Sequence, residues 1–353
     1  MGSRDFLCFP FYLGKIPIFA NNNYTLTRKP WVCQIGREFT KEFLERYDRM
    51  LMEGRDKKKY RNKGARQTTV KTVYGEVTYQ RTVYEVTEED GTRHFVYLLD
   101  ETLELDHVGL ISTNMAELLV KGITELSYRE CARQVSEMTG QTISAMGVWN
   151  VIQALGEKVC EDEAELTEAY KKGQVKGKRE VPVLFKEADG AYIKLQGKDR
   201  KKEKQDKSEI KIGIAYDGWR KTGPDRYALE NKVVVAGFSK AKEFQEYREG
   251  LLPYQSQELE LPDPPEGLEY RNMGTMENHV WSVIAKRMKH GHRSWSRRGG
   301  NHLAKILAKK CSGKLYEVTE RLRRPVFEEE KVEELYGEIL MSAKTPKKDG
   351  KGY

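Results

Sequence analysis

Two carboxylates occupy positions where the surrounding pattern predicts apolar side chains. Asp189 lies in VPVLFKEADGAYIKLQ, a predicted strand in which one face is formed by Val183, Phe185, Glu187, Asp189, Ala191, Ile193 and Leu195. Glu277 lies in the predicted helix RNMGTMENHVWSVIAKRMKHG. At about 100° per residue, its side chain falls within about 60° of an apolar stripe. That stripe consists of Val280, Trp281, Ile284 and Met288. The pattern therefore predicts that both carboxylates face the interior of a domain.

Carboxylates that are brought together inside a domain repel each other unless a cation lies between them. Oxygen ligands of this kind suit Mg²⁺ or Mn²⁺, and a pair of such ions supports phosphodiester chemistry. Each residue also has a plain structural explanation. Asp189 with Gly190 is typical of a turn, and Glu277 near a helix N-terminus is stabilised by the helix dipole. The two readings remain alternatives at this point.

The elements around these carboxylates predict a separate domain. After the Asp189 strand come a charged turn, GKDRKKEKQDKSE, and two further alternating strands, EIKIGIAYDGW and ENKVVVAGF. The Glu277 helix follows them along the chain. We expect three strands in meander order with the helix packed against them.

The N-terminal part carries a helical pattern over residues 38–55, followed by RDKKKYRNKGARQ, in which seven of thirteen residues are Lys or Arg. Such a run is either a solvated, flexible connector or a phosphate-contacting segment. The second alternative makes Lys57, Lys58, Lys59 and Arg61 candidates for DNA contact. Alternation in TTVKTVYGEVTYQRTVYEV and again in HFVYLLD predicts a small antiparallel sheet after it.

Three helical patterns follow from Ser112, with Ser127 as the N-cap of the second and Gly140 in the turn before the third. This order is typical of a helix-turn-helix DNA-binding region, although a plain three-helix bundle gives similar periodicity. On the exposed face of the third helix we expect Gln141, Asn150 and Gln153 to be base-reading candidates. A second basic stretch, MKHGHRSWSRRGGNHLAKILAKK, predicts a DNA-contacting face that includes Arg287, Lys289, Arg297 and Arg298.

The overall charge agrees with a polyanionic partner. The net charge is +8 and the pI is about 9.0, but its sign alone does not separate nucleic acid from an acidic membrane. The most apolar run, FLCFPFYLGKIPIFA, is too short to span a bilayer and is interrupted by prolines. The five cysteines form no C-x-x-C pair, which argues against a zinc ribbon or a disulfide scaffold and favours a reducing cytoplasm.

The segments FKEADGAYIKLQ, EIKIGIAYDGW and GTMENHVWSVIAKRMKHGHRSWSRRGGNHLAKIL resemble bacterial ISLre-type insertion-sequence transposases, and the resemblance extends over residues 38–310. It implies an RNase H-like catalytic domain of the DDE type, with Mg²⁺- or Mn²⁺-dependent cleavage and strand transfer. Asp189 would be the first catalytic and metal-binding carboxylate, and Glu277 the last. The implied partners are the double-stranded terminal repeats of the element and a second copy in a synaptic dimer. The implied location is the bacterial nucleoid.

The sequence also departs from that resemblance. A second catalytic aspartate, in a segment resembling GDGA-x-W-I, is missing between ENKVVVAGF and GTMEN. An internal deletion near Gly250 explains this, and neither Asp217 nor Asp263 lies in a context suited to replace the aspartate. The start MGSRDFLCFPFYLGKIPIFANNNYTLTRKP does not resemble the family either.

Together these features predict an α+β or α/β multidomain protein. We expect an atypical leader (1–30), a helix with a basic segment and small sheet (31–110), and a helix-turn-helix region (111–158). A linker (159–180), a truncated RNase H-like mixed sheet with flanking helices (181–310) and a C-terminal helix with a basic tail (311–353) follow. The predicted function is that of an insertion-sequence transposase by descent, catalytically defective in this copy. The alternative is a non-cleaving protein that recognises element ends.

Overall fold

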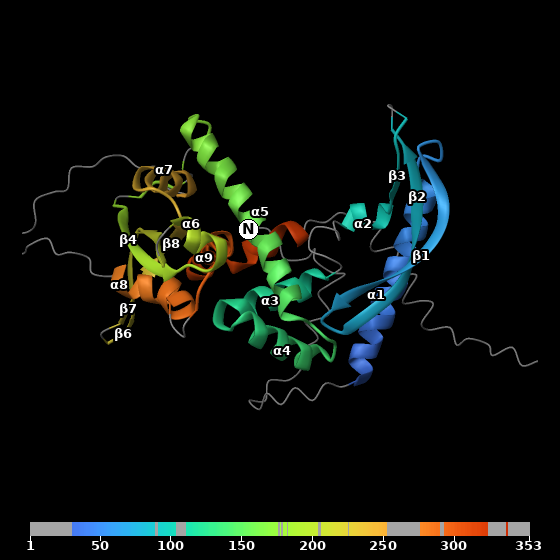
Figure 1. Ribbon diagram of the computed structural model, residues 1–353, viewed down its shortest axis with the longest axis horizontal. Helices are drawn as coiled ribbons and strands as arrows, with labels where there is room; N and C mark the ends of the chain where they lie inside the picture. The colour runs from blue at the N-terminus through green and yellow to red at the C-terminus, as the bar shows by residue number, and fades with distance from the viewer. Residues whose placement is uncertain are drawn as a thin grey trace, which may run out of the picture. The chain divides into compact units, whose positions relative to one another are not determined.

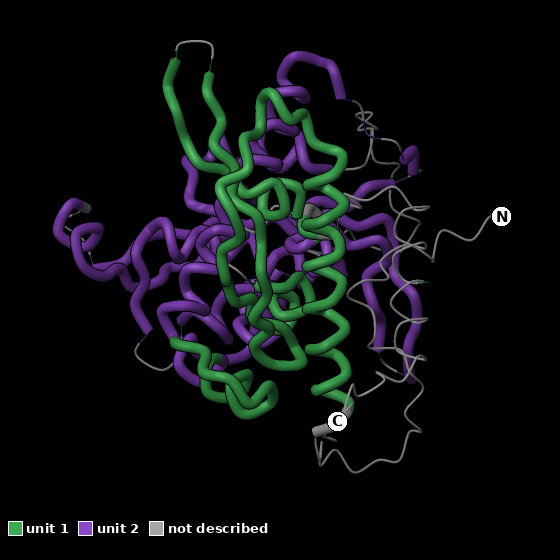
Figure 2. Tube along the Cα trace, turned by 90° about the vertical axis from the view of Figure 1, so that its right-hand side faces the viewer, with its two compact units in different colours: residues 1–119, 132–144, 320–353 green, residues 120–131, 145–319 purple. Residues whose placement is uncertain are grey.

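The computed structural model describes residues 30–88, 91–103, 111–175, 177, 179–181, 183–203, 206–224, 226–252, 276–289, 293–323 and 337. The chain forms two compact units (Figure 2). Unit 1 comprises Met1–Leu119, Ala132–Ser144 and Glu320–Tyr353, and unit 2 comprises Val120–Cys131 and Ala145–Thr319. Each unit is described separately below.

Unit 1 contains a long helix on a three-stranded antiparallel sheet (Figure 1). The helix is α1 (Pro30–Gly54), and the sheet has the order β1 (Tyr60–Thr72), β2 (Gly75–Thr87) and β3 (Arg93–Val96), followed by the short helix α2 (Leu98–Leu103). Aromatic and aliphatic side chains of α1 pack on the sheet and on α2: Phe43, Leu44 and Tyr47 meet Val70, Val77 and Tyr79 of the sheet and Leu99 of α2. The small sheet predicted from alternation is therefore confirmed. Gly75 turns the hairpin with a φ of 120°, a conformation that favours glycine.

Three helices follow as the periodicity predicts. They are α3 (Thr113–Glu125), α4 (Tyr128–Thr139) and α5 (Ala145–Lys171). The Ser127 hydroxyl accepts a hydrogen bond from the Glu130 backbone N–H at 3.1 Å, which confirms the predicted N-cap of α4. Gly140 has a φ of 61° and ends that helix. Helix α5 also contains the whole acidic segment EKVCEDEAELTEAY, so it is longer than the three-helix pattern alone indicates.

Unit 2 contains a second antiparallel sheet with the strand order β4 (Phe185–Lys194), β5 (Lys207–Tyr216) and β8 (Val233–Gly237). The predicted three-stranded meander is confirmed, with two additions. Helix α6 (Gly197–Glu203) forms within the charged turn, and the strands β6 (Gly218–Gly223) and β7 (Arg226–Glu230) form a separate hairpin between β5 and β8. β5 is the central strand, and its isoleucines at 210, 212 and 214 are buried.

Helices complete unit 2. Helix α7 (Ala241–Leu251) follows the sheet, and α8 (Met276–Val280) continues directly into the π-helix η4 (Trp281–Lys289). Helix α9 (Arg297–Cys311) packs on β8 and α5, and the 3₁₀ helix η5 (Leu315–Arg323) comes last in the described chain. Gly156 allows α5 and α9 to approach closely, because a Cβ there would lie 2.4 Å from the Cβ of His302. The architecture is mixed α+β, built from small antiparallel sheets and helices.

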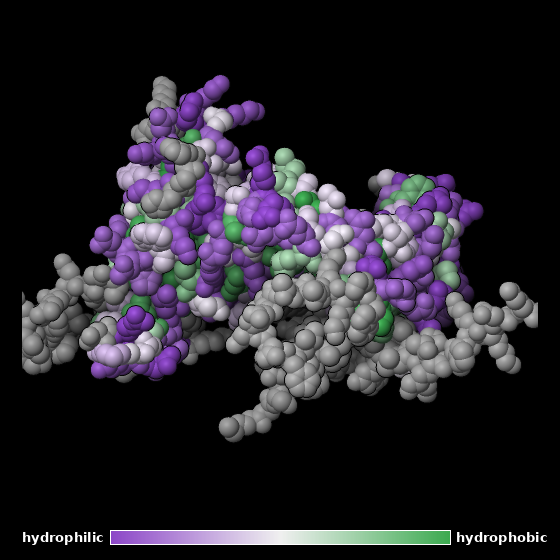
Figure 3. Space-filling model, turned by 90° about the horizontal axis from the view of Figure 1, so that it is seen from below, coloured by the Kyte–Doolittle hydropathy of each residue, from purple (hydrophilic) through white to green (hydrophobic). Residues whose placement is uncertain are grey.

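Several predicted parts fall outside the described residues: the leader, Asp263 with its proline-rich loop, and most of the C-terminal tail. The boundaries of the six predicted domains stay predictions. Hydrophilic residues cover most of the coloured surface in Figure 3. Among the described helices, none combines the length and the apolar character that a membrane crossing needs.

Candidate metal and DNA-binding sites

Asp189 lies in the middle of β4, and the prediction that it faces the interior is wrong. Its side chain is exposed, and Oδ1 accepts a hydrogen bond from the Gly190 backbone N–H at 2.7 Å. The shared face of β4 is buried only further along, at Ala191 and Ile193, where Gly300 at the start of α9 lies against Ile193. Alternation predicts which residues share a face, but the extent of the helix that covers this face decides which of them are buried.

Glu277 is also exposed, so the prediction of a core-facing glutamate is wrong as well. It lies in the short helix α8, whereas the buried side chains of this segment begin at Val283 and include Ile284 and Met288 in η4. A π-helix closes its hydrogen bonds between residues five apart, so it holds more residues per turn than an α-helix. A projection at α-helical spacing therefore loses register across the junction, and Trp281 remains about half exposed.

The elements that carry the two carboxylates are nevertheless adjacent, because α8 and η4 both pack against β4. The residues that the structure describes do not complete a site for Mg²⁺ or Mn²⁺. Within the described residues, no three Asp, Glu, His or Cys side chains are grouped so that they could hold an ion. Two exposed carboxylates that belong to no such group provide fewer oxygen ligands than these cations take from proteins and substrate phosphates together.

Among the described residues, β4 is paired along one edge and largely unpaired along the other. Along its length it pairs with β5, with Asp189 opposite Ile212. On the other side, the described residues provide only a parallel bridge between Leu195 and Trp295. The Trp295 backbone N–H donates to the Lys194 carbonyl at 3.0 Å and its carbonyl accepts from the Gln196 N–H at 2.9 Å. A further strand beside Asp189 would have to occupy the rest of this edge.

Asp217 has a structural role, as its sequence context suggests. Its carboxylate accepts hydrogen bonds from the Asn231 side chain at 3.0 and 2.9 Å, and it pairs with Arg179 at 2.8 Å. These contacts join the two ends of the β6–β7 hairpin to the chain before β4. A carboxylate engaged in this way does not replace a metal ligand near Asp189.

The basic segment RDKKKYRNKGARQ forms a turn and the first part of β1, and is therefore not a flexible connector. Lys57, Lys58 and Lys59 form a turn in which the Asp56 carboxylate accepts from the Lys58 backbone N–H at 2.8 Å. Arg61 lies in β1 opposite Glu85. All four cationic side chains are exposed, so they remain available for a phosphate backbone.

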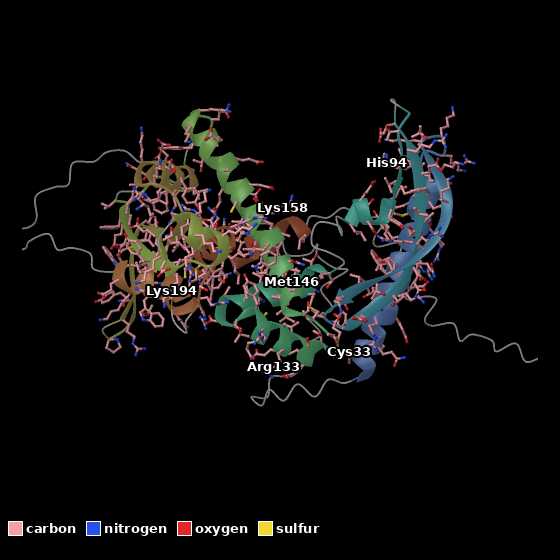
Figure 4. All side chains as sticks on the ribbon, viewed as in Figure 1. Cys33, His94, Arg133, Met146, Lys158 and Lys194 are labelled. Carbon is pink, nitrogen blue, oxygen red and sulfur yellow. The ribbon has the colours of Figure 1, made fainter. Side chains whose placement is uncertain are left out.

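Two of the three candidates near the third helix are not on an exposed face. Gln141 is buried and donates from Nε2 to the Thr72 carbonyl at 2.6 Å. Gln153 is buried, with Oε1 2.9 Å from Nδ1 of His302. The prediction of exposure was wrong because helical spacing does not reveal a polar partner that is distant in sequence. Asn150 is exposed, near the end of α5 that Met146 marks in Figure 4.

The four cations of the second basic stretch differ from one another. Arg287 is buried, its Nε donates to the Ile123 carbonyl at 2.8 Å, and its guanidinium lies over the Trp295 ring. Burial lowers the pKa of Arg287 to about 10, so it stays charged at neutral pH. The prediction that Arg287 contacts DNA conflicts with its burial. Its hydrogen bond to Ile123 instead joins η4 to α3.

The other three members of this stretch remain candidates to different degrees. Lys289 is exposed. Arg298 is exposed and donates two hydrogen bonds to Glu157, at 3.0 and 2.6 Å. Arg297 is half-buried over the Phe238 ring, 5.0 Å from its centroid. A phosphate contact from Arg298 would have to compete with Glu157.

Two of the described cysteines, Cys131 and Cys160, are unsuited to nucleophilic chemistry. Burial raises the pKa values of Cys131 and Cys160 to about 11 in each case, so both thiols are protonated at neutral pH. A thiol needs thiolate character to act as a nucleophile. Cys131 instead fills the space beside Gly122.

Residues 26–249 match the family described as "Uncharacterised protein family (UPF0236)". The match covers more than half of the chain. The chain belongs to this family. The matched region ends at residue 249, one residue before Gly250, where the sequence predicts the junction of an internal deletion.

Curated UPF0236 proteins are similar to about half of the chain. One from Caldanaerobacter subterraneus subsp. tengcongensis is 30% identical over 164 residues, which are 46% of this chain and 32% of the relative. A second from the same organism is 30% identical over 47% of this chain and 33% of its own length. A UPF0236 protein in the vanSb 3' region of Streptococcus gallolyticus is 26% identical over 49% of this chain and 35% of its own length. The chain thus spans about a third of the length of the curated relatives it matches.

The sequence reasoning missed one surface of this UPF0236 chain. The hairpin β6–β7 exposes Trp219, Lys221, Arg226 and Tyr227 on adjacent strands. The signal was present in GWRKTGPDRYALE, where a Gly-Pro pair separates two short alternating segments. The sequence predicts a strand that ends at Trp219 and assigns no element to the residues between it and ENKVVVAGF.

Proposed function

We propose that this UPF0236 protein is an insertion-sequence transposase by descent that binds DNA but does not cleave it. The observation that carries the proposal is the arrangement around β4. Asp189 lies on a strand of a three-stranded antiparallel sheet, and the helix with Glu277 packs against that strand. This is the order of elements that the resemblance to DDE transposases implies for an RNase H-like domain.

The loss of cleavage follows from what is missing beside Asp189. The metal chemistry of this class needs several carboxylates around the ions, and the described residues contain no group of three acidic, His or Cys side chains that could hold an ion. The end of the UPF0236 match at residue 249 supports a deletion that removed the strand with the middle aspartate. The largely open edge of β4 agrees with this interpretation.

DNA binding is supported by the exposed cations. The turn Lys57–Lys59 with Arg61, together with Lys289, presents positive charge to solvent, and the whole chain has a net charge of +8. Contacts of this kind provide most of the affinity for a phosphate backbone without reading sequence. We place the protein on duplex element ends in the bacterial nucleoid, where it would pair with a second copy and compete with intact transposase.

The test combines binding with cleavage. The purified chain is mixed with labelled duplex DNA from the flanks of its own gene, first without metal and then with Mg²⁺ or Mn²⁺. We expect affinity to fall steeply with rising salt and no nick to form with either ion. Metal-dependent nicking that Asp189→Asn abolishes would show an active enzyme, and salt-insensitive or absent binding would refute DNA recognition.

A charge-matched control identifies the binding surface. Replacing Lys57, Lys58 and Lys59 with Ala removes three exposed positive charges from unit 1. Replacing Lys198, Lys201 and Lys202 with Ala removes the same number from exposed positions on α6. We expect the first variant to bind DNA more weakly than the second. Equal losses would mean that net charge alone, and not this turn, determines the affinity.

A further inference from the structure

The β6–β7 hairpin is a small two-stranded ribbon outside the main sheet of unit 2. It runs from Gly218 to Glu230 and pairs with no third strand among the described residues. Figure 1 shows it at the lower left, below β4 and β8. Trp219 is 46% exposed and Tyr227 is 64% exposed. Two large aromatic side chains are thus exposed together on one short ribbon, and exposed apolar side chains that gather in one patch mark binding sites.

The strand register places these rings on the same face. Trp219 is opposite Leu229, and Lys221 is opposite Tyr227. Directly paired residues, and residues two apart on one strand, point to the same side of a sheet. One face therefore carries Trp219, Lys221 and Tyr227, with the two rings in diagonal positions about 7–8 Å apart. A cation thus stands beside two flat apolar surfaces.

Two aromatic rings of the main sheet pack against the Trp219 ring and fix its position. Its ring lies 4.6 Å from the ring centroid of Phe185 and 5.5 Å from that of Tyr216. The Tyr216 hydroxyl in turn donates to the Glu187 carboxylate at 2.9 Å. A ring that is fixed by two neighbours and half exposed is preorganised, because little side-chain entropy is lost when a ligand stacks on it. Phe185 and Asp189 are four residues apart on β4, which corresponds to about 13 Å.

Basic residues outnumber acidic ones on the ribbon, which favours an anionic ligand. From Gly218 to Glu230 the sequence contains Arg220, Lys221 and Arg226 against Asp225 and Glu230. The one ion pair between the described strands, Arg220 with Glu230, is exposed and 3.8 Å long, so it is weak. Lys221 lies on the same face as the two rings and can reach a phosphate while bases lie on them, whereas Arg220 and Arg226 alternate with these residues and lie on the opposite face of the ribbon.

We propose that the β6–β7 ribbon binds single-stranded DNA by stacking unpaired bases on Trp219 and Tyr227. Aromatic rings beside cations are the usual means of binding single strands, because every base offers a flat face. Bases inside a duplex are already stacked on each other and cannot use the two rings in this way. The inference rests on the proposed function, to which it adds a substrate form: a frayed or unpaired DNA end close to Asp189.

The test measures the affinity of the full chain for oligothymidylate and for a mixed-sequence duplex of equal length, at the same salt concentration. Tyr227→Ala is the decisive variant, because this ring is mostly exposed and its removal leaves the aromatic cluster under Trp219 intact. We expect oligothymidylate to bind roughly tenfold more weakly and duplex affinity to change by less than about twofold. Trp219→Phe, which keeps a ring, should retain more single-strand affinity than Trp219→Ala.

Tyr316→Ala is the matched control, since it removes another half-exposed tyrosine ring of unit 2, outside the ribbon. It should not change either affinity. If the wild type binds duplex DNA but Tyr227→Ala equals it on oligothymidylate, or weakens both forms equally, the ribbon proposal is wrong and the proposed function stands. If the wild type binds neither form, both fail. Tighter binding of oligouridylate, lost in the same variant, would assign the ribbon to RNA instead.

Discussion

A buried ion pair links three helices of unit 2, and its removal gives a well-defined prediction. Lys305 on α9 donates from Nζ to Glu163 on α5 at 2.6 Å and to the hydroxyl oxygen of Tyr247 on α7 at 2.8 Å. The Tyr247 hydroxyl donates to Glu163 at 2.6 Å. Burial, with the nearby Glu163, raises the pKa of Tyr247 well above its usual value, so this hydroxyl keeps its proton. The charged side chains are only 9% and 7% exposed.

Lys305→Met keeps a long apolar side chain but leaves the Glu163 carboxylate buried with one hydrogen-bond donor. Removing one partner of such a pair costs about 3–5 kcal/mol. For a domain of this size we expect the midpoint of thermal unfolding to fall by roughly 6–20 °C, as measured by calorimetry. The double variant Lys305→Met with Glu163→Gln should recover part of the loss, because a neutral amide needs no counter-charge and still accepts from Tyr247.

The matched control is Lys171→Met, which removes a lysine from the exposed pair with Glu168 on α5. Exposed pairs of this kind contribute little, so its unfolding midpoint should equal that of the wild type. The reasoning is refuted if Lys305→Met is as harmless as Lys171→Met. It is also refuted if the effects of Lys305→Met and Glu163→Gln simply add, since residues in one buried network should show strong coupling.

Three further predictions address the α5–α9 contact and the basic turn. Gly156→Ala should destabilise the protein by about 1–3 kcal/mol in urea unfolding, because the new Cβ would overlap His302, whereas Gly54→Ala, with no atom within 4 Å, should not. Burial lowers the pKa of His302, so on acidification the unfolded chain takes up a proton at this position before the folded chain does. Stability should therefore fall as the pH drops from about 7 to 5. His302→Gln should flatten this pH dependence of the unfolding midpoint, and an unchanged slope would contradict the argument. Replacing Lys57–Lys59 with Ala should make the slope of log affinity against log salt less negative by about 3, and an unaltered slope would exclude these lysines from phosphate contact.

The sequence predicted best the elements whose signals are local. The hairpin around Gly75 and the N-cap at Ser127 depend on residues within one turn or one strand pair, and both are present as predicted. The strands β4, β5 and β8 also follow from alternation alone. In each case the pattern and the determining contact lie in the same short segment.

The failures concern burial, which depends on partners far along the chain. Gln153 is buried because His302, 149 residues later, lies beside it. Arg287 is buried because it bonds to the carbonyl of Ile123, 164 residues earlier. Neither contact leaves a trace in the local periodicity. Glu277 illustrates a different limit, since the helical projection assumed α geometry and η4 departs from it.

The exposure of both carboxylates agrees with the proposal that this domain does not cleave DNA. In a complete metal site, mutual repulsion between carboxylates is offset by bound cations, and burial strengthens that attraction. Asp189 and Glu277 instead lie in water, where neither needs a counter-ion and each is tolerated singly. A truncation that removed the third carboxylate and its strand would therefore leave a sheet free of unpaired buried charge. The domain can lose catalysis and still fold, and a folded remnant with exposed cations can still occupy DNA that an intact transposase would cut.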